Sequence, residues 1–163
     1  MDLKEAMAKA LEFERKGREY YLEVANNTED RFVKDVFNYV AEQEVFHEKE
    51  IQGYIDSSDV SLNEDEPSEI KNFFNKEVTE FKNELSASSD HTEAYKKAME
   101  LEKHAYNFYK EQYDKTDDEK LKKFLDFLMK QESGHYKLFE NSMNFLENPD
   151  GFHMEMEDWN FEG

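Results

Sequence analysis

The stretch VAEQEVFHEKE at residues 40–50 returns as LMKQESGHYKL at residues 128–138, which is 88 positions further along the chain. Each copy holds a glutamate followed three residues later by a histidine, and residues at this spacing lie on one face of a helix. A motif that recurs at a fixed shift indicates an internal repeat. The two Glu-x-x-His motifs consist of Glu44 with His47 and of Glu132 with His135.

The same shift aligns a second stretch, upstream of each motif. It places KEAMAKALEFERKGREYYLEV at residues 4–24 on TEAYKKAMELEKHAYNFYKEQ at residues 92–112. Apolar residues recur in all four stretches at the spacing of an amphipathic helix. Each half of the chain therefore predicts a hairpin of two antiparallel helices, and two hairpins make a four-helix bundle. We expect these helices at about residues 2–26, 29–55, 91–114 and 117–146.

Residues with short polar side chains stand where three of these helices should begin. Thr28 and Thr116 are each followed by acidic residues, so we expect them to be the N-caps of the second and fourth helices. Asp90, with Glu93 three residues later, is the expected start of the third helix.

The segments outside the hairpins have different characters. Between the hairpins, PSEIKNFFNKEVTEFKNEL has apolar residues at helical spacing and predicts a crossover helix over about residues 67–86. We therefore assign residues 1–148 to one bundle domain and residues 149–163 to a C-terminal tail. The tail contains Phe, Met and Trp, so we expect it to pack on its own bundle or on a second subunit.

The composition supports an all-α domain. Charged residues make up 37% of the 163 residues and the mean hydropathy is -1.04, which alone would fit a disordered chain. However, 15% of the residues are aromatic, and so much aromatic surface requires a packed interior. Only 5 Gly and 2 Pro are present, as expected for long helices.

The charge and the absent residue types exclude several function classes. A net charge of -19 argues against nucleic acid and anionic membrane surfaces as partners. The sequence contains no cysteine, which excludes disulfides and thiolate metal sites. No segment is apolar enough for a signal peptide or a membrane span, and we therefore expect a cytoplasmic protein.

Glutamates fall where the core of the bundle should be. In the first helix, the inward positions at alternating spacings of four and three run Leu3, Met7, Ala10, Glu14, Gly17, Tyr21 and Val24. The other three stripes likewise carry Glu, or Glu and His, near their middle. Four facing carboxylates would repel one another unless something compensates their charge, and two divalent cations would do so. The predicted metal ligands are Glu14, Glu44, His47, Glu102, Glu132 and His135.

Other interpretations of single residues are weaker than this combination. One Glu-x-x-His motif means little in so acidic a chain, an inward glutamate can be protonated or paired with lysine, and a core histidine can be purely structural. The equal internal spacing decides between them, because Glu14 and Glu44 are 30 residues apart and so are Glu102 and Glu132. The arrangement is that of di-iron carboxylate bundles.

The pattern Glu-x6-Tyr followed by Glu-x-x-His, present twice, resembles the ferritin-like superfamily and, within it, the rubrerythrin-like proteins. This resemblance implies two bound iron ions, with manganese or zinc as alternatives. It implies that Glu14 and His47 are terminal ligands of one ion, that Glu102 and His135 hold the other, and that Glu44 and Glu132 bridge.

The resemblance also assigns residues around the ligands. Tyr21 and Tyr109 match tyrosines that in the family lie just outside the metal ligands, and they share a helix face with the glutamates seven residues before them. Gln43 and Gln131 stand where relatives often carry an aspartate that binds the metal-bound histidine of the opposite helix, and a glutamine oxygen could accept that imidazole N–H.

The sequence departs from the best-known relatives in three places. Rubrerythrins proper carry a Cys-rich rubredoxin domain, and this sequence has no cysteine. They also carry an extra glutamate where Ala105 stands here, and bacterioferritins have a haem-binding methionine where Val45 stands. Neither peroxide reduction nor iron storage therefore transfers intact.

The resulting functional hypothesis is a non-haem di-iron redox protein. It would oxidise a bound Fe(II) pair with hydrogen peroxide or O2, receive electrons from an external donor, and assemble as a homodimer. One alternative is an iron-binding protein that handles Fe(II) without catalytic turnover. Another is a helical interaction module that a redox-silent metal such as zinc stabilises.

Overall fold

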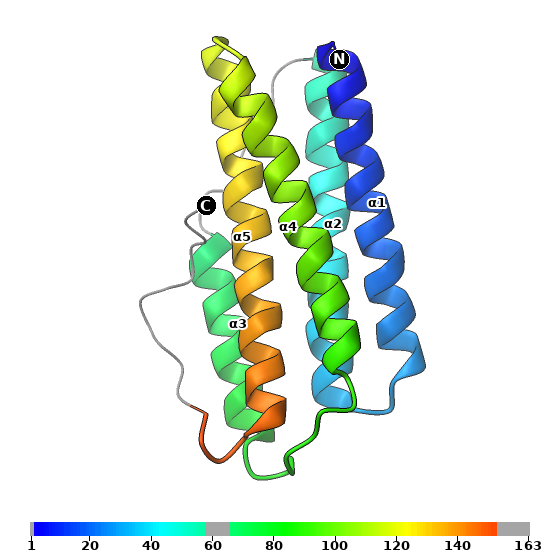
Figure 1. Ribbon diagram of the computed structural model, residues 1–163, viewed down its shortest axis with the longest axis vertical. Helices are drawn as coiled ribbons and strands as arrows, with labels where there is room; N and C mark the ends of the chain where they lie inside the picture. The colour runs from blue at the N-terminus through cyan, green and yellow to red at the C-terminus, as the bar shows by residue number, and fades with distance from the viewer. Residues whose placement is uncertain (1, 58–65, 153–163) are drawn as a thin grey trace.

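Four long antiparallel helices and one shorter helix make up the described part of the chain (Figure 1). The structure, a computed structural model, describes residues 2–57 and 66–152. Within these residues there are helices and connecting turns but no strand, so the expected all-α bundle with a crossover helix is confirmed. The helices are α1 (Leu3–Asn27), α2 (Arg31–Ser57), α3 (Glu66–Phe81), α4 (Thr92–Lys115) and α5 (Glu119–Glu147).

The helices pair in the order that the repeat predicts. The closest packing is within each hairpin, between α1 and α2 and between α4 and α5. The hairpins meet through α1 against α4 and through α2 against α5. The crossover helix α3 lies along α5, beside one end of the bundle, and also touches α2 (Figure 1). Short loops within each hairpin and a longer connection between hairpins give this arrangement.

The caps of α2 and α5 differ from the prediction. Thr28 and Thr116 close the helices before them, and each threonine hydroxyl accepts a hydrogen bond from the backbone N–H two residues later. The carboxylates of Asp30 and Asp118 accept the first backbone N–H groups of α2 and α5 instead. A negative charge at the positive end of the helix dipole is the better cap. Both helices therefore begin two residues later than expected.

The boundaries around α3 and α4 also move. The residue before α4 is His91 rather than the expected Asp90, and its side chain makes no capping hydrogen bond. The crossover helix ends at Phe81, five residues short of the expected end, and turns follow it. The first tail residues pack on the bundle, because the ring of Phe152 lies edge-on to Phe74 and Phe145 at centroid distances of 5.8 and 5.6 Å. The rest of the expected tail, residues 153–163, lies outside the described residues.

Two apolar clusters fill the bundle, one towards each end. One includes Phe32, Phe37 and Phe139, and the other includes Met7 and Leu125. The predicted inward stripe of α1 holds from Met7 to Tyr21 but not at its ends, since Leu3 is 43% exposed and Ala25 is buried where Val24 was expected. The reason is that a straight helix has 3.6 residues per turn, so a stripe with a strict period of 3.5 drifts off the core face.

Candidate metal centre

A layer of polar side chains lies in the middle of the four long helices, and all six predicted ligands belong to it. Each of the six has a relative exposure of 2% or less. Helices α1 and α4 each contribute one glutamate, and α2 and α5 each contribute a Glu-x-x-His motif. Burial of this kind costs free energy unless the charges are compensated. The residues are Glu14, Glu44, His47, Glu102, Glu132 and His135.

Ring nitrogens of the two histidines point into the carboxylates. His47 Nδ1 lies 3.6 Å from a Glu14 oxygen and 3.7 Å from a Glu132 oxygen. His135 Nδ1 lies 3.2 Å from a Glu44 oxygen and 3.5 Å from a Glu102 oxygen. The histidine rings themselves stack with centroids 5.3 Å apart. Side chains from all four long helices therefore converge on one small volume.

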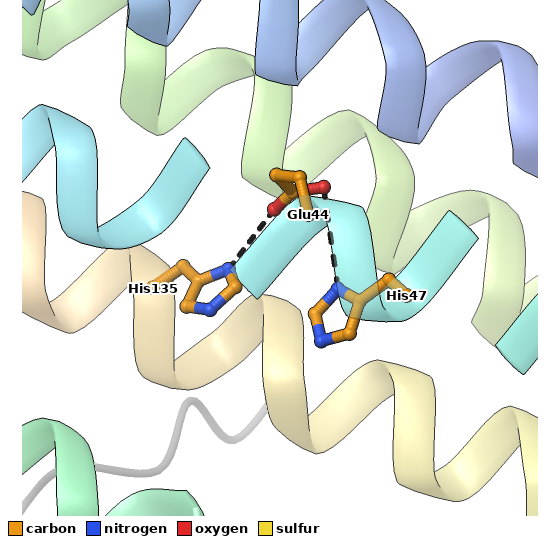
Figure 2. A group of neighbouring side chains, drawn as sticks. All are labelled: Glu44, His47 and His135. Carbon is orange, nitrogen blue, oxygen red and sulfur yellow. Dashed lines mark ion pairs between the residues drawn. The ribbon is translucent and has the colours of Figure 1, made fainter. Parts of the chain in front are cut away.

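Glu44 reaches both histidines, as Figure 2 shows. One of its oxygens is 3.2 Å from His135 Nδ1 and the other is 4.0 Å from His47 Nδ1. A carboxylate whose two oxygens face two different nitrogen donors has the geometry of a bridge between two ions. Glu132 lies 3.7 Å from His47 Nδ1, and it also belongs, with His135, to a group whose ligand atoms lie within 4.8 Å of one another.

The ligand atoms form two overlapping groups of four, and in each group the atoms lie within 4.8 Å of one another. Glu44 and Glu132 belong to both groups. Glu14 and His47 complete the first, and Glu102 and His135 complete the second. This division is the one that the sequence resemblance implies for two ions with two bridging carboxylates. That these residues ligate metal stays a prediction.

The electrostatics of the cluster require a cation or bound protons. Burial, and then the carboxylates of Glu102 and Glu14, raise the pKa of Glu132 well above its usual range. Several inward atoms also lack a hydrogen-bond partner within the described part of the chain. Buried polar atoms without partners are rare, and a bound metal ion would supply the missing partners. These atoms are Glu44 Oε1, Glu102 Oε2, Glu132 Oε1 and His135 Nδ1.

Each of the two predicted tyrosines contacts a glutamate of the cluster that belongs to the opposite hairpin. Tyr21 of α1 donates a hydrogen bond of 2.7 Å to Glu102 of α4, and Tyr109 of α4 donates one of 2.7 Å to Glu14 of α1. Sequence reasoning placed each tyrosine on the face of its own helix's glutamate and missed this exchange. Burial, and then the charge of the accepting carboxylate, raise the pKa of both tyrosines, so each remains a donor at neutral pH.

The expected glutamine contacts are present on one side only. Gln131 Oε1 lies 2.9 Å from His47 Nε2, from α5 to α2, as expected. The equivalent expectation for Gln43 is wrong: it is half-buried, and His135 Nε2 has no hydrogen-bond partner among the described residues. The contact from Gln131 to Nε2 fixes the orientation of the His47 ring, so that its Nδ1 atom faces the carboxylates.

A helical bundle with a carboxylate–histidine layer at its centre defines the ferritin-like class of proteins. A family model described as Rubrerythrin matches residues 5–143 of this chain. The chain therefore belongs to the rubrerythrin family. Searches of the curated proteins and of the solved structures each found no match. Among the described helices, none combines the length and the apolar character that crossing a membrane demands.

Proposed function

We propose that this protein is a non-haem di-iron redox protein that reduces hydrogen peroxide, or O2, at the buried carboxylate–histidine cluster. The observation that carries the proposal is the pair of overlapping ligand groups that share Glu44 and Glu132. Carboxylate and imidazole donors suit iron and manganese, and the set contains no soft sulfur ligand. Four carboxylates and two imidazoles would balance two divalent ions, and the unpartnered inward atoms are the ones that would bind them.

A pair of Fe(II) ions would supply the two electrons that reductive cleavage of a peroxide O–O bond requires. The protein's own residues orient the ligands and keep water out of the cluster. Gln131 holds the His47 ring with Nδ1 inward, and the tyrosine hydroxyls each restrain one oxygen of Glu14 or Glu102. The apolar clusters above and below the polar layer keep bulk water away, which strengthens every charge interaction inside it.

Two further parts of the proposal concern partners. Repeated turnover needs an external electron donor, because the sequence holds no cysteine that could serve a thiolate redox centre. A homodimer is supported by the outer surface of α2, where Val45 and Phe46 are 38% and 53% exposed. Adjacent exposed apolar side chains of this size favour burial against another surface.

The test is anaerobic loading of metal-free protein with Fe(II), followed by metal analysis and rapid mixing with peroxide or with O2. We expect two irons per chain and faster oxidation by peroxide than by O2. His47→Ala should lower the iron content and slow the oxidation, because it removes one of two nitrogen donors. Glu12→Gln, on the exposed side of the same helix as Glu14, is the matched control and should change neither. Full stoichiometry and rate in His47→Ala would refute the assignment.

An iron-handling protein without catalytic turnover is the second candidate, and the net charge of -19 favours it, because an acidic surface attracts Fe(II). The same loading experiment separates the two. Iron retained beyond a fixed pair, with better reaction towards O2, would support iron handling. Tight binding of redox-silent zinc would instead support a metal-stabilised interaction module.

A further inference from the structure

The two overlapping ligand groups differ in how their histidines are held. Gln131, which is 2% exposed, lies with its Oε1 atom 2.9 Å from Nε2 of His47. His135 is also fully buried, and its Nε2 atom has no hydrogen-bond partner among residues 2–57 and 66–152. The internal repeat makes the two histidines equivalent in sequence, so the difference comes from what surrounds each ring.

This difference affects metal binding through the position of the imidazole proton. Both rings turn Nδ1 towards the carboxylates, so a metal ion in the cluster would bind the lone pair of Nδ1 (Figure 2). A neutral imidazole has one ring proton, which must then be on Nε2. In His47 this N–H would donate to Gln131, whereas in His135 it would be a buried donor without an acceptor. An unpaired buried donor costs free energy that a paired one does not.

The carboxylates do not offset this difference between the groups. Tyr109 donates a hydrogen bond of 2.7 Å to Glu14 in the first group, and Tyr21 donates one of the same length to Glu102 in the second. The other two glutamates belong to both groups. Each group therefore has an equivalent set of carboxylates held in the same way, and the histidines are the ligands whose surroundings differ.

One charge near the first group is neutralised by an ion pair. Arg18 stands one helical turn after Glu14, and an unpaired guanidinium there would repel a cation in the first group. Its Nε and Nη2 atoms donate to the two carboxylate oxygens of Glu48 over 2.6 and 3.3 Å, and both side chains are less than one-third exposed. The pair also joins α1 to α2, the helices that carry Glu14 and His47. It therefore restrains the first group and adds no net charge to it.

We infer that the group of Glu14 and His47 takes the first metal ion and that the group of Glu102 and His135 takes the second, more weakly. This inference rests on the proposed metal centre. Gln131 is a positioning residue, because it would act on the ion only through the His47 ring. Since loss of such an outer contact weakens metal binding by about 10- to 100-fold, the two binding steps should differ by at least about 10-fold. Repulsion between the two ions widens this gap but does not decide which group fills first.

The test is titration of metal-free protein with Co(II), followed by visible absorption and by NMR of the imidazole N–H protons that bound Co(II) shifts. Neither readout depends on redox activity. The unmodified protein should bind two Co(II) ions in two steps, and a single shifted N–H signal should be present after the first. That proton should exchange slowly with water, because Gln131 accepts its hydrogen bond. Gln131→Leu should weaken the first step by about 10- to 100-fold and bring the two steps together.

The two histidines provide a matched pair of variants. His135→Ala should keep the tight first step and its shifted N–H signal, whereas His47→Ala should lose both and keep only a weak step. If His47→Ala does not fold, Gln131→Leu still decides. A single step in the unmodified protein, a tight step that Gln131→Leu leaves unchanged, or loss of the tight step in His135→Ala would overturn the order of filling, while two bound Co(II) ions left the metal centre standing. Failure of the unmodified protein to bind Co(II) would overturn both.

Discussion

The two hairpins of the bundle carry the same pattern of three predicted ligands in different surroundings. Every predicted ligand in α1–α2 has an identical residue 88 positions later in α4–α5. Outside the ligands, Tyr21 and Tyr109 also match, but the match fails at other positions one helical turn from the ligands, such as Arg18 against Tyr106. The charge balance of the cluster constrains the inner residues of both halves equally. The outer residues differ because each half faces a different neighbour.

Helix α3 is the clearest example of such a neighbour. A side chain at Gly134 would bring its Cβ to 2.8 Å from Ile70 of α3, so glycine allows the crossover helix to lie close against α5 beside the cluster. The equivalent residue in α2 is Phe46, which is 53% exposed. One half of the centre is thus covered by the chain itself, and the other presents an aromatic side chain at the surface.

The largest expected effect tests whether matching glutamates of the two hairpins contribute equally to metal binding. In the two residues that we expect to bridge, Glu44→Gln and Glu132→Gln should each abolish most of the stabilisation that added Fe(II) or Co(II) confers. The same variants should make the metal-free protein more stable by about 1–3 kcal/mol, since one of four mutually repelling buried carboxylates is gone. Urea unfolding with and without metal measures both effects. A variant that kept its metal-dependent stabilisation would show that the shared residues are not equivalent.

A smaller effect tests the difference in hydrogen bonding. Gln131→Leu removes the acceptor that orients His47 and should weaken binding of one metal ion by about 10- to 100-fold, which is typical when such an outer contact is lost. Gln43→Leu should have little effect, because His135 Nε2 donates no hydrogen bond to it. Competition titration with a chelator measures both affinities. Equal weakening by the two substitutions would mean that the halves are alike in solution.

The exchanged tyrosines should give equal effects. Tyr21→Phe and Tyr109→Phe each remove one 2.7 Å hydrogen bond to a buried carboxylate of the opposite hairpin. We expect each to destabilise the metal-free protein by about 1–2 kcal/mol in urea unfolding. Tyr20→Phe, whose half-buried hydroxyl makes only a 3.5 Å contact to a backbone carbonyl, is the control and should cost less. A one-sided loss would show that only one of the two bonds persists in solution.

The sequence predicts the centre of each helix better than its ends. Glu44 and His47 could be placed inward because a helical period fixes which residues share a face, whatever the helix packs against. The start of α2 was misplaced because Thr28 and Asp30 are both good caps, and only the three-dimensional path shows which one receives the first backbone N–H groups.

The side-chain contacts between the two hairpins could not be predicted from the sequence. That Tyr21 reaches Glu102 rather than Glu14 depends on how far α1 and α4 are displaced along their axes, which the period of neither helix specifies. The same holds for the one-sided contact of Gln131, because Gln43 is identical in sequence and differs only in what lies opposite. The family resemblance supplied the residues that surround the ligands, and the structure supplied their partners.

The smallest expected effect concerns the crossover helix α3, which packs more closely on the second hairpin than on the first. Glu77 of α3 is buried, and burial, then the hydrogen bond and charge of Asp35 in α2, raise its pKa from 4.5 to about 8. Glu80 adds to this shift and Lys76 opposes it. The second hairpin has Lys123 at the position of Asp35, so the repeat offers no equivalent pair.

A raised folded-state pKa fixes the sign of the pH dependence. The folded protein holds this proton more tightly than the unfolded chain, so the stability that Glu77 contributes is complete below pH 4.5 and is lost as the pH rises through about 8. Glu77→Gln keeps the shape without the charge. Relative to the variant, the unmodified protein should therefore lose about 1 kcal/mol between pH 5 and pH 9, a value discounted for the nearness of this helix to solvent.

Urea unfolding of both metal-free proteins at the two pH values measures this difference, and subtracting one protein from the other cancels the pH dependence of the central carboxylates. Glu80→Gln, whose side chain is 47% exposed, is the control and should show a smaller change. A difference between Glu77→Gln and the unmodified protein that stayed constant from pH 5 to pH 9 would mean that Asp35 and Glu77 are apart in solution. Helix α3 would then be held to α2 by its aromatic contacts, Phe73 with Tyr39 and Phe81 with Phe32, and not by this carboxyl pair.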